Sequence, residues 1–237
     1  MKRFGRTDIM EMDRYLTVAE FFEMLEKIVS GTGNEIYRVD DEILQQPEER
    51  IKRRTAAGII HRVLLSAGEA DEEQIEAALR LKDLYTCRTC VNHIAQVYVK
   101  GIMTEWSDGV FGLDEQITYR EAEEIIQKIT NKQLRRKPES GVYAGWTAIM
   151  WQEAEQMLKE DRRILLVDVR SEEEYSQEHR KGSINAPLQA LFKNPYCVCA
   201  DRAAVLFLYC QRGYKSRIAA GLLTEAGYQK VYVVLHP

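Results

Sequence analysis

The sequence has 237 residues, of which 45% are hydrophobic and 30% charged, and its formal net charge at pH 7 is −4. This length suits one or two globular domains, and the composition excludes a disordered or fibrous chain. The nearly balanced charge gives no sign of nucleic-acid binding, and no apolar run approaches the roughly 18 residues that a membrane span needs.

The first residues and the cysteine count predict a cytoplasmic protein as the chain stands. The basic start, Lys2 and Arg3, is followed by Asp8 and Glu11 rather than by an apolar core, so no secretory signal is predicted. Five cysteines are an odd number in a chain that can build its own core, which favours a reducing compartment over a disulfide framework. The cell surface is the alternative if an export segment upstream of Met1 is missing.

The first half of the chain, residues 1–131, has the pattern of an all-α domain. Apolar periodicity predicts helices over residues 16–29, 54–65, 72–82, 91–99 and 118–129. Thr17 with Glu20, and Thr118 with Glu121, have the spacing of a capping box, and Asp71 is the expected N-cap of the third helix.

Three of these helices open in a similar way, at residues 17–20, 54–57 and 118–122, which indicates an internal repeat. Residues 81–130 resemble one full S-layer homology motif. The matching parts are Lys82-Asp83, Ile94-Ala95, Gly101-Ile102-Met103, Ser107-Asp108-Gly109 with Phe111, and Ile117-Thr118 with Arg120-Glu121-Ala122.

In the S-layer homology family, three copies form a helical module that often anchors proteins to cell-wall polysaccharide. The resemblance therefore implies a polysaccharide or a protein as the partner of this half. The family's Thr-Arg-Ala-Glu ligand motif is altered here to Thr118-Tyr119-Arg120-Glu121. A helical scaffold or interaction module therefore stays open beside wall binding.

Residues 132–141 are predicted to be a linker, because a basic run is followed by Pro138 and Gly141. A solvated hinge is a better interpretation of this run than a nucleic-acid contact. In residues 142–237 the pattern changes to alternating elements. Helices are expected over residues 147–159, 171–175 and 218–226, and strands over 164–169, 203–208 and 231–234. Such alternation is typical of an α/β fold with an open, mostly parallel sheet and helices on both faces.

Cys210 follows the second of these strands and lies in a tight loop that leads into a helix. The N–H groups at a helix start have no partner within the helix, so they can hold an anion, and their field favours a thiolate over a thiol. Arg212, Lys215 and Arg217 add positive charge. Cys210 is therefore the candidate nucleophile, and a buried structural thiol is the alternative.

The length of the loop separates two reaction types. Phosphatases with a cysteine nucleophile need an arginine six positions later, where its fork holds phosphate oxygens. That position is Ser216 here, with Lys215 before it and Arg217 after it. The shorter ring suits a single sulfur better than a phosphate group, so sulfur transfer is favoured over phosphoryl transfer.

Residues 142–237 resemble a rhodanese domain, because several separated motifs occur in the family's order. The motifs are Leu166-Val167-Asp168-Val169-Arg170, Glu173-Glu174-Tyr175, His179 with Gly182-Ser183-Ile184-Asn185-Ala186-Pro187, Cys210 with Gly213 and Lys215-Ser216, and Ala226-Gly227-Tyr228 with Val231. In that family the loop cysteine takes up a sulfane sulfur as a persulfide and passes it to cyanide or a thiol.

The resemblance implies a thiosulfate-type sulfurtransferase with Cys210 as the sulfur carrier, a small anionic donor, a thiol or cyanide acceptor, and no cofactor or metal. The residues expected to bind the donor are Gln211, Arg212, Gly213, Tyr214, Lys215 and Ser216. Those expected to support the site are Asp168, Arg170, His179 and Arg217, with Arg170 paired to Glu174 or to the Cys210 loop. The alternative is a non-catalytic binding or sensing protein.

Two other features stay open. The family's His-Ile-Pro-Gly is replaced by His179-Arg180-Lys181-Gly182, which makes that loop more basic. Cys87 and Cys90, with His93 three residues on, fall short of the four ligands of a structural zinc site, and a redox role is not favoured outside a strand-to-helix turn. Packing is the default for Cys197 and Cys199, which could otherwise act as resolving thiols for Cys210.

Overall fold

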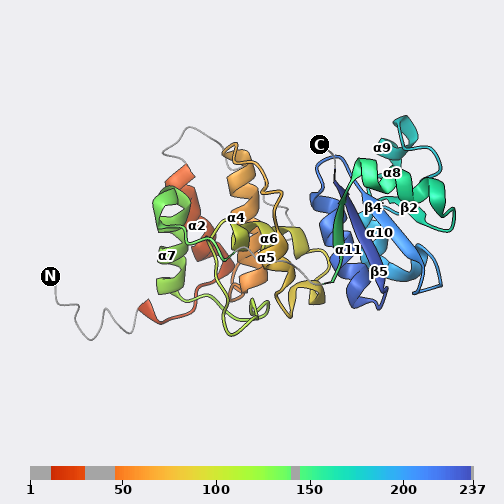
Figure 1. Cartoon of the computed structure of the whole chain (residues 1–237). Coiled ribbons are helices and arrows are strands. Elements are labelled where there is room, and N and C mark those ends of the chain that lie inside the picture. The colour runs from red at the N-terminus through yellow and green to blue at the C-terminus, as the bar shows by residue number, and fades with distance from the viewer. Residues whose placement is uncertain (1–11, 30–45, 140–144, 236–237) are drawn as a thin grey trace. The chain divides into compact units, whose positions relative to one another are not determined.

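The computed structural model describes residues 12–29, 46–139 and 145–235 (Figure 1). By their internal contacts these residues form two units. The first comprises residues 12–29, 46–72 and 81–139, and the second comprises residues 73–80 and 145–235. Residue 142, the predicted start of the second domain, lies outside the described residues. Within the described ranges no helix has both the length and the apolar character needed to cross a membrane.

The first unit is built from helices. They are α2 (Val18–Val29), α4 (Arg53–Ser66), α6 (Val91–Val99) and α7 (Tyr119–Thr130), with the 3-10 turns η2 (Leu84–Thr86) and η3 (Lys132–Leu134). The capping box of α2 is confirmed, since the Glu20 N–H donates to Thr17 Oγ1 and the Thr17 N–H donates to the Glu20 carboxylate. Thr118 caps α7 by accepting from the Glu121 N–H, but the Glu121 carboxylate pairs with Arg53, so only half of that box forms.

The helix expected over residues 72–82 is wrong, because only α5 (Glu76–Leu79) is helical there. Both main-chain groups of Glu72 bind the side-chain amide of Gln96 in α6, at 2.8 and 2.9 Å. The Asp71 carboxylate, expected to cap the helix, instead contacts the His61 ring at 2.7 Å. A longer helix would need the main-chain groups of Glu72 for its first turn and the Asp71 carboxylate for its N-cap. Both are engaged instead by contacts with Gln96 and His61.

Three residues of the first unit are joined by a closed ring of main-chain hydrogen bonds. The N–H of Leu16 donates to the carbonyl of Ile117, that of Ile117 to Ile51, and that of Ile51 to Leu16, at 2.9–3.1 Å. All three side chains are fully buried. Each residue stands two positions before a helix, α2, α4 or α7, so the three helices start around one point.

The second unit contains a five-stranded parallel sheet in the order β1-β5-β4-β2-β3. The strands are β1 (Thr147–Met150), β2 (Leu165–Asp168), β3 (Ile184–Asn185), β4 (Val205–Tyr209) and β5 (Lys230–Leu235). The helices are α5 in residues 73–80, α8 (Trp151–Glu160), α9 (Glu172–Gln177), α10 (Leu188–Lys193) and α11 (Tyr214–Glu225), with the 3-10 turn η4 (Pro195–Cys197). The predicted α/β fold with a parallel sheet is confirmed.

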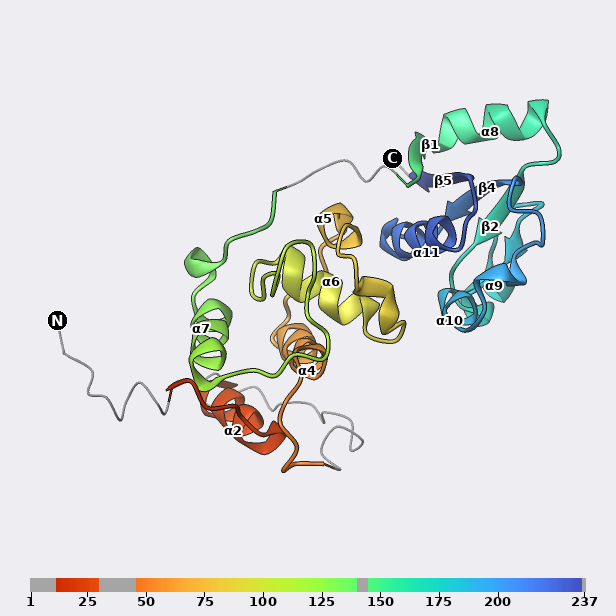
Figure 2. The same cartoon turned by 90° about the horizontal axis from the view of Figure 1, so that it is seen from below.

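Both faces of the sheet are covered, as Figure 2 shows for α8 on one side and α11 on the other. Phe207 and Tyr209 of β4 belong to the core cluster under α8, which includes Ala154. Side chains alternate along a strand, so Leu206 and Leu208 face the side of α11, and both are fully buried. β4 is thus held from both faces, which fixes the position of the loop that follows it.

The helix expected over residues 147–159 is wrong in its first turn. Residues Thr147–Met150 form β1 and pair in parallel with β5, from Thr147 opposite Tyr232 to Met150 opposite Leu235. Met150 is 43% exposed. Pairing with the edge of the sheet gives this segment hydrogen bonds and β-branched packing that outweigh its helical pattern.

The cysteines differ from the expectation in one respect. Cys87 and Cys90 are joined by a disulfide, whereas Cys197, Cys199 and Cys210 are free thiols. A chain expected to lack a disulfide framework thus forms one local bridge, between cysteines three residues apart.

Candidate active site

Cys210 is positioned by the central strand of the second unit. β4 ends at Tyr209 and α11 begins at Tyr214, so a loop of four residues joins them. Cys210 is only 2% exposed and stands at the carboxyl end of a parallel strand, where open α/β sheets bind ligands. The structure thus gives the cysteine the place that the sequence predicts.

Gly213 makes this short connection possible. It is the N-cap of α11 and has a φ of 80°, in the left-handed region that favours glycine. A Cβ atom at this position would lie 2.7 Å from the Arg217 guanidinium. The turn therefore lets α11 begin four residues after Cys210, and a larger residue would disturb it.

Ser216 is hydrogen-bonded both to the sulfur of Cys210 and to the loop that follows it. The Cys210 thiol donates to Ser216 Oγ at 3.6 Å, and the Ser216 hydroxyl donates to the Gly213 carbonyl at 2.8 Å. Ser216 is fully buried, so both contacts are shielded from water. This serine, at the position where a phosphatase needs arginine, ties the sulfur to the turn.

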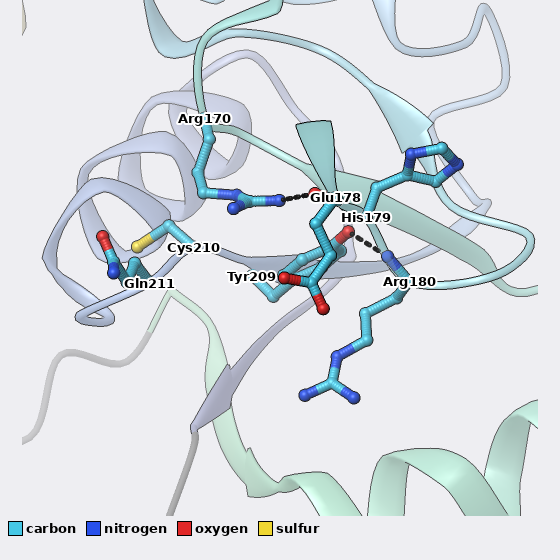
Figure 3. A pocket seen from close by; sticks show the side chains of 7 residues that line it. All are labelled: Arg170, Glu178, His179, Arg180, Tyr209, Cys210 and Gln211. Carbon is cyan, nitrogen blue, oxygen red and sulfur yellow. Dashed lines mark hydrogen bonds between the residues drawn. The ribbon is translucent and has the colours of Figure 1, made fainter. Parts of the chain in front are cut away.

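A pocket of about 320 Å³ opens in front of Cys210. It is lined by Arg170, Glu178, His179, Arg180, Tyr209, Cys210 and Gln211. Figure 3 shows Cys210 and Gln211 on one side, Glu178, His179 and Arg180 on the other, and Arg170 between them. The guanidinium groups of Arg170 and Arg180 border this space together with the carboxylate of Glu178, and the two cations suit an anionic ligand.

Arg170 is held in place by Asp168, at the end of β2. The Asp168 side chain is fully buried and accepts from the Arg170 main-chain N–H and from two nitrogens of its guanidinium, with a shortest distance of 2.6 Å. Arg170 also donates to the Glu178 carbonyl at 2.7 Å. The hydrogen bond to Asp168 raises the pKa of Arg170, against the opposing effect of burial. The expected pairing of Arg170 with Glu174 or the Cys210 loop is replaced by this contact with its own strand.

Arg180 is a pocket residue that the residue assignments from sequence missed. Its guanidinium lies over the Trp151 ring, 4.5 Å from the centroid, and its main-chain N–H donates to the Tyr209 hydroxyl at 3.2 Å. Burial raises the pKa of Tyr209, which keeps the hydroxyl a neutral acceptor. The basic replacement of the family's His-Ile-Pro-Gly was the signal that could have identified Arg180.

The other expected site residues are more dispersed. Lys215 pairs with Glu174 at 3.4 Å, and Arg217 pairs with Glu76 at 2.8 Å. Arg212 is exposed and does not line the pocket described above. Of the four cations expected to serve or support the donor site, the structure therefore brings only Arg170 to the pocket.

His179 lines the pocket but is held by its own loop. Its ring stacks on Tyr175 at 4.0 Å between centroids, and its Nδ1 lies 2.9 Å from the Tyr175 carbonyl. Figure 3 shows the ring turned away from Cys210. This geometry fits an orienting role rather than proton transfer. Among the described residues, no group of three or more His, Cys, Asp or Glu side chains is placed to hold a metal ion.

Comparison with known proteins finds a family that matches the part of the chain containing this site. A model described as "Rhodanese-like domain" matches residues 150–235. Thiosulfate sulfurtransferase GlpE of Coxiella burnetii (strain RSA 331) is 30% identical over 83 residues, which are 35% of this chain and 75% of that protein. Thiosulfate sulfurtransferase PspE of Escherichia coli (strain K12) is 37% identical over 65 residues, 27% of this chain and 62% of that protein.

Among solved structures, reduced CoADR-RHD of Bacillus anthracis matches with a TM-score of 0.34 and 22% identity. The match covers 63% of this chain and 24% of that one. A likeness of this size supports no argument about this protein.

Proposed function

Since the chain belongs to the rhodanese-like family through residues 150–235, we propose that it is a sulfurtransferase that carries sulfane sulfur as a persulfide on Cys210. The observation that carries the proposal is the position of the thiol. It is a buried, unbridged cysteine between the end of a central strand and a helix start, behind a pocket bordered by cations. The two relatives described above are both named thiosulfate sulfurtransferases, which supports thiosulfate as the donor class.

The proposed reaction has two steps, and both conserve atoms and charge. The Cys210 thiolate attacks the outer sulfur of thiosulfate, the sulfur–sulfur bond of the donor breaks, and sulfite leaves with the electron pair. Cyanide or a thiolate then attacks the terminal sulfur of the persulfide, which returns Cys210 to its thiolate. The first N–H groups of α11 would stabilise the negative sulfur in both steps.

The residues predicted from sequence keep proposed roles in this scheme. Gln211, Arg212 and Gly213 of the loop, with Tyr214, Lys215 and Ser216 of the first turn of α11, would surround the persulfide or the donor. Arg170, which the structure brings to the pocket, would contact the anionic donor directly, and Asp168 would position it. Arg180 joins Arg170 as a second candidate contact on the other side of the pocket.

The proposal is tested by measuring thiocyanate formed from thiosulfate and cyanide. We expect turnover in the wild type and none above background in Cys210→Ser. Cys197→Ser is the matched control, because it removes another free thiol of the same unit and should keep the activity. Equal activity in wild type and Cys210→Ser would disprove the role of Cys210. Hydrolysis of an aryl phosphate by the wild type would favour phosphoryl transfer instead.

A second candidate function concerns the first unit. We propose that this unit is built from three related copies and serves as a binding module for cell-wall polysaccharide or for a protein. The ring of hydrogen bonds between Leu16, Ile51 and Ile117 supports the threefold organisation, because it joins equivalent positions before three helices. Co-sedimentation of the full chain with purified cell-wall polysaccharide tests the proposal that the first unit binds polysaccharide. A chain that stays in the supernatant at all polysaccharide concentrations contradicts it.

A further inference from the structure

The first unit contains a second sulfur site, which the proposed sulfur transfer at Cys210 does not use. Cys87 and Cys90 are joined by a disulfide across two exposed residues, Arg88 and Thr89, and both cysteines are half-buried. A small thiol can therefore reach the bridge from solvent. The pair lies between the 3-10 turn η2 and the nine-residue helix α6.

The two sulfurs of this bridge are not equivalent. Cys90 is the N-cap of α6 and has helical backbone angles, and its carbonyl accepts the first hydrogen bond of the helix, from the Ile94 N–H at 2.9 Å. A thiolate at this position is stabilised by the helix field, whereas Cys87 stands before the helix starts. Cys90 is therefore the better leaving group when the bridge is opened.

A chain of hydrogen-bonded side chains leads to the same helix turn. The Asp71 carboxylate contacts His61 Nε2 at 2.7 Å, and His61 Nδ1 contacts His93 Nδ1 at 2.8 Å. Because Asp71 accepts from His61 Nε2–H, neutral His61 accepts at Nδ1 from His93. The His61 side chain is only 1% exposed, so this contact is shielded from water.

His93 stands three residues after Cys90, on the same side of the first turn of α6. Burial opposes the ionisation of Asp71, but the hydrogen bond from His61 outweighs it and lowers the pKa of this carboxyl. The Asp71 carboxylate and His61 hold the His93 ring in place, so His93 can carry a proton for the Cys90 sulfur three residues before it. This carboxylate–imidazole–imidazole chain passes through the fully buried His61 and ends at a half-buried histidine, three residues after a half-buried cysteine of the disulfide.

We propose that Cys87 and Cys90 form a thiol–disulfide exchange site for low-molecular-weight thiols, with His93 as the group that returns a proton to Cys90. A thiolate attacks Cys87 Sγ, the bond between Cys87 and Cys90 breaks, and its electron pair goes to Cys90, which takes a proton from His93. A second external thiolate attacks the external sulfur of the mixed disulfide, the bond from that sulfur to Cys87 Sγ breaks, and Cys87 leaves as a thiolate that takes up a proton. The two external thiols depart joined as a disulfide. In sum, the two external thiols lose two electrons and two protons, and the Cys87–Cys90 disulfide gains these electrons and protons as it becomes two thiols.

The first test follows the bridge in the full wild-type chain with glutathione as the probe. The protein is equilibrated in buffers of graded reduced and oxidised glutathione, alkylated and mapped by mass spectrometry. We expect the Cys87–Cys90 peptide to shift from disulfide to doubly alkylated thiols within the series. A bridge that persists in the most reducing buffer is structural, and thiols that persist in the most oxidising buffer never exchange; either result overturns the proposal.

The second test concerns His93. We expect His93→Gln to slow reduction of the bridge on the order of a hundredfold near neutral pH, since a positioned proton donor typically contributes that much or more. His179→Gln, a histidine of the other unit, is the matched control and should reduce at the wild-type rate. Equal rates for His93→Gln and wild type would remove His93 from the mechanism. The double variant Cys87→Ser, Cys90→Ser should keep sulfur transfer at Cys210, which shows that the chain is folded.

Discussion

Each unit presents a cysteine at the start of a helix, and the two sites differ in what surrounds the sulfur. Cys210 is nearly inaccessible, unbridged and fixed by a central strand, and guanidinium groups border the pocket in front of it. Cys90 is half-buried, bridged to Cys87 and followed three residues later by His93, which is linked through the buried His61 to the Asp71 carboxylate. The same helix field acts on both sulfurs, so their neighbours must decide the chemistry. Cations favour an anionic sulfur donor, whereas a partner thiol and a proton carrier favour exchange.

The largest expected effect comes from removing the negative charge of Asp168, which holds Arg170 at the pocket of Cys210. Asp168→Asn leaves Arg170 without its buried partner, and breaking a buried ion pair in this way costs about 3 kcal/mol. We expect this loss in the unfolding free energy of the second unit, with a tenfold or greater loss of thiocyanate formation, because Arg170 is no longer held at the pocket. Denaturant unfolding and the turnover assay measure the two effects.

The chain contains a matched control for this change. Asp161 makes the same contacts to an arginine two residues on, Arg163, but on the surface, with 37% and 90% of the two side chains exposed. Solvent screens such a pair, so Asp161→Asn should change neither stability nor activity measurably. If the two variants behave alike, burial is not what gives the Asp168 pair its importance.

A smaller effect is expected at the two ends of α11. Gly213 and Gly227 both have a positive φ, of 80° and 96°, and alanine in that region costs about 1–2 kcal/mol. Only at Gly213 does the added carbon meet a side chain, that of Arg217, within 3 Å. We therefore expect both alanine variants to lose stability, but only Gly213→Ala to lose most of its sulfur transfer. Comparable activity in the two variants would mean that the loop geometry behind Cys210 does not matter.

The smallest effect concerns the first unit and its response to acid. Burial opposes the ionisation of Glu69, but contacts from Arg135, Lys132 and Lys100 outweigh it and lower the pKa of this carboxyl from 4.5 to about 2. In this range the unfolded chain binds the proton that the folded chain excludes. The contribution of Glu69 is therefore present above pH 4.5 and is lost as the pH falls towards 2.

We expect this acid-dependent loss to be about 1 kcal/mol, since solvent screens part of the interaction. Glu69→Gln should lack it, so its unfolding free energy should fall less steeply with decreasing pH than that of the wild type. Thermal unfolding followed by helical circular dichroism across this range provides the comparison. Parallel curves for the two proteins would show that Glu69 is not a source of the acid sensitivity.

The sequence predicts most of the second unit because its signals are local and repeated. The apolar strands, the helix starts and the place of Cys210 all follow from patterns within a few residues. The predictions fail where distant contacts decide. Residues 147–150 pair with β5 in the sheet, and the main-chain groups of Glu72 bind Gln96 instead of partners in a helix. The Asp71–His61–His93 chain joins residues up to 32 positions apart, and no local pattern shows it.

The sequence predicts several of the residues that line the pocket, but it predicts less well which cations lie there. Cys210, Gln211 and Arg170 meet at the pocket, but Lys215 and Arg217 are engaged by Glu174 and Glu76, and Arg180 takes the place expected for them. Positive charge near a cysteine is visible in the sequence, but which cation reaches the pocket depends on where the carboxylates lie.

The most direct measurement is the location of the sulfur after reaction with thiosulfate. The full chain is treated with thiosulfate, freed of excess reagent, and mapped by mass spectrometry under conditions that preserve persulfides. We predict one added sulfur atom on the peptide that contains Cys210, and none on any peptide of Cys210→Ser. Sulfur added to another cysteine in the absence of Cys210, or no added sulfur on the wild type, would contradict the account.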